Sequence, residues 1–148
     1  MFRSLALCFT MAYVAFGCTC RPYNPKIRYC HAEVVGLFTV EQQVNSSPVE
    51  YFYRAHPTQI FKSKENSPAL DETLFISTMM HSAACGLSEI TPGENRLLSG
   101  YYDSENNIFS VSSCSQISAI NWDKVPDDVK TALQNGGYDC TTTTTPKH

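Results

Sequence analysis

Short apolar segments with β-strand character recur along the chain between turn-forming residues. The segments are residues 32–40, 49–61, 74–78, 96–102 and 108–112. Turn signals rich in Asn, Ser, Pro and Gly separate them, at Asn45, Asn66, Thr91 and Asp103. Pro57 lies inside the second segment, which predicts a sheet edge or a bulge there. Five short strands at this spacing predict a mainly β fold, a small five-stranded barrel.

Two helices are expected to flank this barrel. Pro126 and the two aspartates that follow it suit the first turn of a helix, and Gly136 suits its exit. An apolar stripe runs between them, made of Val129, Ala132 and Leu133. A second short helix is expected over residues 25–30. No repeat or internal domain boundary is visible, so we expect one domain over residues 18–140, followed by a Thr-rich tail at residues 141–148.

The first 17 residues have the features of a removable secretion signal. Arg3 supplies the positive charge, residues 5–16 are apolar, and Ala15 and Gly17 are the small residues required before a cleavage site. The apolar run is too short to span a membrane. We therefore expect cleavage after Gly17 and a secreted, extracellular protein that begins at Cys18 and does not associate with a membrane.

The net charge of −3 becomes more negative when Arg3 is removed. This mild acidity argues against nucleic acid, heparin-like chains or anionic lipid as the main partner. The aromatic run at Tyr51, Phe52 and Tyr53 is therefore interpreted as barrel core and edge rather than as a stacking platform for single strands.

Cysteines are the most informative residues in this chain. Cys8 lies in the expected signal, and six remain: Cys18, Cys20, Cys30, Cys85, Cys114 and Cys140. In an oxidising compartment six cysteines predict three disulfides, and spacing alone does not decide the pairing. Cys18 and Cys20 are too close to pair with each other without strain, so both are expected to pair with cysteines that are distant in the sequence. Zinc ligation by these thiols is the disfavoured alternative, because the one close pair has C-x-C spacing and the histidines are scattered.

Catalytic motifs are not found. The sequence has no G-x-S-x-G, H-E-x-x-H or P-loop, and no cysteine is left over to act as a nucleophile. Glu89 and Glu94 are interpreted as solvated loop carboxylates. The triplet that begins at Asn45 is a possible N-glycosylation acceptor in a predicted loop.

The residues from Cys18 to Cys30, C-T-C-R-P-Y-N-P-K-I-R-Y-C, resemble the opening of the mature tissue inhibitors of metalloproteinases. Further similarity follows at Ser82-Ala-Ala-Cys-Gly, Leu97-Leu-Ser-Gly-Tyr, Val111-Ser-Ser-Cys and Asn121-Trp. The resemblance extends to Cys140. It implies a netrin-like barrel of the oligosaccharide/oligonucleotide-binding type with the pairings Cys18–Cys85, Cys20–Cys114 and Cys30–Cys140. In length, the chain resembles the short, single-domain members.

The resemblance also implies a function, inhibition of zinc metalloendopeptidases of the matrix metalloproteinase-like kind by a monomeric protein. The α-amine and carbonyl of Cys18 would chelate the catalytic zinc of the target, and the inhibitor would hold no cofactor or metal of its own. The residues implied in protease binding are Cys18, Thr19, Cys20, Arg21, Pro22, Ser82, Ala83, Ala84 and Cys85. Thr19 would enter a primed-side pocket, and residues 82–84 would contact the unprimed side. Arg21 departs from the family, which usually has a small or aliphatic residue there.

Two other interpretations stay open at this point. A netrin-like barrel can act as a non-inhibitory binding module that engages a receptor or a matrix protein. A lipid-anchored bacterial protein is the second, because residues 15–18 loosely resemble a lipobox, although Phe16 fits that motif poorly and acylation would block the amine of Cys18.

Overall fold

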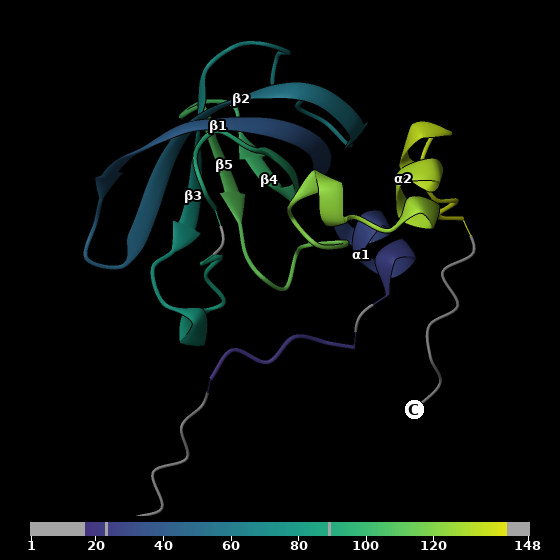
Figure 1. Ribbon diagram of the computed structural model, residues 1–148, viewed down its shortest axis with the longest axis horizontal. Coiled ribbons are helices and arrows are strands. Elements are labelled where there is room, and N and C mark those ends of the chain that lie inside the picture. The colour runs from purple at the N-terminus through teal and green to yellow at the C-terminus, as the bar shows by residue number, and fades with distance from the viewer. Residues whose placement is uncertain (1–16, 23, 89, 142–148) are drawn as a thin grey trace, which may run out of the picture.

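The computed structural model describes residues 17–22, 24–88 and 90–141 of the chain. Within these ranges the strands form a closed barrel in the order β1-β2-β3-β5-β4 (Figure 1). The strands are β1 (Val34–Ser46), β2 (Glu50–Ser63), β3 (Leu74–Met79), β4 (Asn95–Asp103) and β5 (Ile108–Val111). The prediction of a mainly β, five-stranded barrel with flanking helices is confirmed.

Strand β1 is the central element of the barrel. It pairs antiparallel with β2 on one side and with β4 on the other. The barrel closes through a parallel pairing of β3 with β5. Because parallel neighbours require a crossover, the chain passes through a short 3₁₀ helix, η1 (Ser82–Ala84), and through β4 before it enters β5. This crossover places η1 at one end of the barrel (Figure 1).

The boundaries of β1 differ from those that the sequence predicts. The strand begins at Val34 because Ala32 is the C-cap of the preceding helix, and it continues to Ser46. Asn45, predicted in a loop, therefore lies in the last part of β1, and this prediction was wrong. Residues 41–46 are polar and exposed except for the half-buried Val44, so they carry little apolar signal, while the ladder to β2 continues past Gln43. Asn45 is itself exposed, and its glycosylation stays a prediction.

Pro57 lies at an irregularity of the ladder between β1 and β2. Leu37 pairs with Gln59 whereas the next residue, Phe38, pairs with Pro57, so Thr58 is the extra residue of a bulge. The bulge accommodates a residue without a backbone N–H inside a paired strand. The prediction of a bulge is confirmed, and Pro57 is fully buried in it.

Both faces of β1 are buried, which explains the continuous apolar run in its first half. Val34, Phe38 and Val40 point into the barrel, where the ring of Phe38 stacks on that of Phe109 at 4.7 Å. Val35 and Leu37 face outward to a second core under the helices. The aromatic run of β2 packs in the barrel, as predicted. Tyr53 is buried in the barrel core, and the partly buried Tyr51 packs against that core.

Helices α1 (Pro25–His31) and α2 (Asp127–Gln134) cover the second core at one end of the barrel (Figure 1). Helix α1 begins where the Asn24 side chain accepts a hydrogen bond from the Ile27 N–H at 3.1 Å. Helix α2 begins after Pro126 and buries Val129 and Leu133, as its apolar stripe predicts. Among the described residues, no helix has the length and apolar content needed to cross a bilayer.

Candidate functional site

Three disulfides join the N-terminal part of the chain to distant elements. They are Cys18–Cys85, Cys20–Cys114 and Cys30–Cys140, with Cα–Cα distances of 5.1, 5.1 and 5.5 Å. These are the pairings that the family resemblance implies. The first two tie residues 18–22, which we call the wedge, to the end of η1 and to the segment that follows β5. A segment near a chain terminus is ordinarily frayed, so these bridges are what gives the wedge a defined position.

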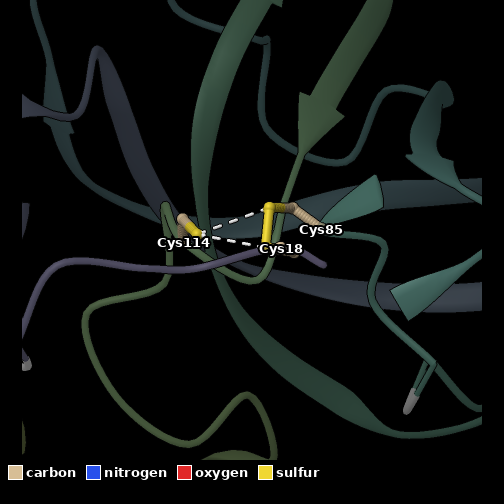
Figure 2. Close-up of side chains that lie close together, drawn as sticks. All are labelled: Cys18, Cys85 and Cys114. Carbon is tan, nitrogen blue, oxygen red and sulfur yellow. Dashed lines mark hydrogen bonds between the residues drawn. A yellow bond between two sulfur atoms is a disulfide. The ribbon is translucent and has the colours of Figure 1, made fainter. Parts of the chain in front are cut away.

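The two bridges of the wedge are in contact with each other. The Cys114 Sγ lies 3.5 Å from the Cys18 Sγ and 3.6 Å from the Cys85 Sγ (Figure 2). Sulfurs from these three residues lie within 4.8 Å of one another, a spacing that a metal ion could bridge. All three are joined in disulfides, however, and it is the thiolate that ligates a metal. The cluster therefore serves as a packed anchor for the wedge.

Backbone geometry orients Cys85 toward the wedge. Cys85 ends η1 in the left-handed conformation, with φ of 62°. The turn is closed because the Cys85 N–H donates to the Ser82 carbonyl and the Gly86 N–H to the His81 carbonyl. A Cβ at Gly86 would collide with the Met79 carbonyl oxygen, so only glycine fits at this close approach. The partner of Cys18 is thereby held by a rigid turn.

The structure brings together the two segments that the sequence predicts to contact a protease. Exposed residues lie on both sides of the Cys18–Cys85 bridge, whereas the bridged cysteines themselves are half-buried. The exposed members are Thr19, Arg21, Pro22, Ser82, Ala83 and Ala84. A protein surface that meets one segment would therefore meet the other as well. Gly17, which precedes the wedge, is also exposed, and a Cβ on it would contact nothing within 4 Å.

A groove of about 590 Å³ runs along one side of the wedge. Residues 19–22 form one wall, and the other walls come from α1 and from strands β4 and β5. Its lining includes the charged Arg28 and Glu33 and the Tyr101 ring, which is 54% exposed. The groove therefore lies between the wedge, helix α1 and the surface of the barrel.

Two long cationic side chains that sequence reasoning missed hold the surroundings of the wedge. Arg28 of α1 donates through Nη2 to the Arg21 carbonyl at 3.1 Å. Lys62 of β2 donates through Nζ to carbonyls of the last turn of α1 and its C-cap, at 3.0 Å to Cys30 and 2.7 Å to Ala32. Burial is the main factor that lowers the pKa of Lys62, with a smaller contribution from a neighbouring lysine. No sequence pattern marks these contacts, because their acceptors are backbone carbonyls.

Glu94 is an exposed loop carboxylate, as predicted, and it also forms an ion pair. Its Oε2 lies 2.6 Å from Nη2 of the buried Arg96 and accepts a hydrogen bond from Asn121 Nδ2 at 3.0 Å. The sequence does not predict this ion pair, which forms because Arg96 is buried on β4 and carries a charge that requires a partner. The role of Glu94 is structural, since it connects β4 to the segment before η2 (Trp122–Lys124). Glu89 lies outside the described residues, as do the expected signal up to residue 16 and the tail from residue 142.

A family model described as tissue inhibitor of metalloproteinase matches residues 17–146. The chain belongs to this family. The match begins at the residue before the wedge and covers the barrel, both helices and all six bridged cysteines. Membership in the tissue inhibitor of metalloproteinase family indicates a metalloproteinase inhibitor rather than an enzyme, with metalloproteinases as its partners and an extracellular setting that suits the three disulfides. None of the curated proteins matches the chain.

Proposed function

We propose that the protein is secreted, is cut after Gly17, and inhibits zinc metalloendopeptidases as a monomer by chelating their catalytic zinc through Cys18. The observation that carries this proposal is the pair of contacting disulfides that fix residues 18 and 20 while Thr19 between them stays exposed. A terminus held in this way loses little conformational freedom when it binds, which favours tight association.

The chemistry depends on the backbone of Cys18. Its α-amine and carbonyl oxygen can form a five-membered chelate with a zinc ion that has an open coordination position. The pKa of an α-amine lies at about 7.7–8.0, so a neutral fraction exists near pH 7 and zinc binding releases the remaining proton. The Cys18 sulfur takes no part because it is bonded to Cys85. Chelation would displace the water that the protease uses as its nucleophile.

Cleavage after Gly17 is essential to this mechanism. In the uncut chain the nitrogen of Cys18 belongs to a peptide bond, and an amide nitrogen has no basic lone pair to offer a metal. The uncut form should therefore not inhibit by chelation.

The rest of the interface follows from the exposed residues beside Cys18. Thr19 is β-branched and stiff at χ1, so it would enter the primed-side pocket next to the zinc at little entropic cost. Arg21 and Pro22 would continue along the cleft, and Ser82, Ala83 and Ala84 would contact its unprimed side. A long cation at position 21 would alter the selection among proteases.

The test begins with N-terminal sequencing and intact mass of the secreted protein, followed by titration against a panel of zinc endopeptidases. We expect a terminus at Cys18 and stoichiometric inhibition. A variant with one alanine inserted before Cys18 should lose inhibition, whereas a matched control with one alanine added after His148 should keep it. A blocked or displaced terminus, or equal inhibition by the two variants, would exclude chelation by the amine. Absence of inhibition across the panel would favour a non-inhibitory binding module.

A further inference from the structure

Arg28 connects the wedge to the barrel beyond the point where the disulfides end. The bridges fix residues 18 and 20, and the next residue, Arg21, has its carbonyl held by Arg28 Nη2 at 3.1 Å. The Nη1 of the same guanidinium donates to the Gln116 carbonyl at 2.8 Å. We propose that Arg28 is a positioning residue that fixes the outer part of the wedge for protease binding, an inference that rests on the proposed function.

The acceptor on the barrel side is itself immobile. Gln116 is only 5% exposed, and its side chain is bonded to β4 in both directions. Its Nε2 donates to the Ser99 carbonyl at 3.0 Å, and its Oε1 accepts from the Ser99 N–H at 3.1 Å. Nε2 also donates to the Ser112 carbonyl at 2.8 Å, at the end of β5. The guanidinium therefore spans from a fixed point on the barrel to the backbone of the wedge.

The helix that carries Arg28 is held at both ends. Asn24 caps its first turn, and Lys62 binds the carbonyls of its last turn. The Cys30–Cys140 bridge ties the same helix to the segment after α2. Because α1 cannot shift easily, Arg28 defines the distance between the barrel and residue 21.

Arginine suits this task better than lysine. The planar guanidinium presents several N–H donors in a fixed fork, so that one side chain can bind two carbonyls at once. A lysine donates from a single nitrogen on a flexible stem, so it binds carbonyls that converge on one point, as Lys62 does, and does not hold two separate carbonyls at a fixed spacing. The group that is held is the backbone of residue 21, so the contact does not depend on the Arg21 side chain, which is exposed.

The test compares Arg28→Ala and Arg28→Lys with the control Arg54→Ala. Arg54 lies on β2, where it donates a hydrogen bond to Glu41. Its replacement by alanine removes the same charge at a site outside the wedge and its groove. The first readout is the ¹⁵N order parameter of the residue 19–21 amides, which should fall from about 0.85 to below about 0.6 in Arg28→Ala. The second readout is the inhibition constant, which should rise about tenfold in Arg28→Ala. This factor corresponds to the free energy of ordering roughly one backbone residue on binding. Arg28→Lys should recover part of both, and the control should change neither.

A double-mutant cycle separates positioning from general stability. Pro22→Gly loosens the same segment by freeing its φ angle. If Arg28 acts by ordering the wedge, Arg28→Ala combined with Pro22→Gly should raise the inhibition constant by less than the product of the single effects. Full multiplicativity, unchanged order parameters, or an inhibition constant equal to that of Arg54→Ala would each overturn the proposal. If the wild-type protein inhibits no protease, the proposed function fails, while the order parameters still decide whether Arg28 holds the wedge.

Discussion

Removal of the Cys18–Cys85 bridge should weaken inhibition far more than removal of the Cys30–Cys140 bridge. The perturbation is the double substitution Cys18→Ala with Cys85→Ala, which leaves the α-amine and carbonyl of residue 18 in place. The matched control is Cys30→Ala with Cys140→Ala, which deletes a bridge between α1 and the segment after α2. The comparison therefore isolates the anchoring of the wedge from the loss of a disulfide as such.

The two variants should lose similar amounts of global stability. The bridges close loops with sequence separations of 67 and 110 residues. The chain-entropy relation gives about 4.4 kcal/mol for the first and about 4.8 kcal/mol for the second. The difference of about 0.4 kcal/mol is too small to explain a large difference in activity. Urea unfolding monitored by circular dichroism measures both losses.

Inhibition should separate the two variants clearly. Without its bridge, residues 18 and 19 have no covalent anchor before Cys20, and both must be ordered when the zinc binds. Ordering two backbone residues costs about 3 kcal/mol, which corresponds to roughly a hundredfold weaker inhibition. The control should inhibit within about threefold of the wild type.

The assay is titration of a sensitive zinc endopeptidase at a temperature well below the melting temperature of both variants. If the Cys18/Cys85 variant inhibits as tightly as the control, the wedge does not need its anchor and the reasoning from preorganisation is refuted. If both variants lose inhibition in proportion to their unfolded fraction, stability alone explains the result.

Two further predictions concern charged side chains. Lys62→Met should lower the free energy of unfolding in urea by about 2 kcal/mol, because half-buried carbonyls at the end of α1 lose their hydrogen-bond donor. The control Lys64→Met should change stability little, because the hydrogen bond of Lys64 is exposed and longer, at 3.4 Å. Hydrogen bonds from His56, and then from Arg54, lower the pKa of the Glu41 carboxyl. The resulting stabilisation is complete above the pKa of a free glutamate and is lost as pH falls through the lower folded value. An NMR titration should find that His56→Ala raises the Glu41 midpoint; an unchanged midpoint would contradict this origin.

Local patterns in the sequence predict the elements of this fold well. Short apolar segments between turn residues predict all five strands, and the two expected helices correspond to α1 and α2 of the described residues. The main error is the end of β1, where residues 41–46 are polar except for Val44 because the hairpin with β2 is largely solvent-exposed there. A strand that is exposed on both faces leaves no periodic signal, and only its backbone ladder identifies it.

Pairings between distant segments are beyond local patterns. The parallel contact between β3 and β5 joins strands on either side of β4, and no short-range signal encodes it. Cysteine spacing left the disulfides unresolved, and the pairings came from the resemblance to the family. The ion pair of Arg96 with Glu94 was not predicted either, because it depends on how the turn before β4 places the carboxylate.

The features that rigidify the wedge were the hardest to foresee, and the reason is chemical. Arg28 and Lys62 bind backbone carbonyls, and every residue of a protein carries one, so that no residue type marks the acceptor. The same holds for Gly86, whose need for glycine arises from a carbonyl of the preceding strand. Sequence motifs therefore predict the residues proposed to meet a protease, whereas the contacts that hold those residues depend on how the barrel brings backbone groups together. Substitutions at Arg28 should therefore alter inhibition although Arg28 is not among the residues proposed to contact the protease.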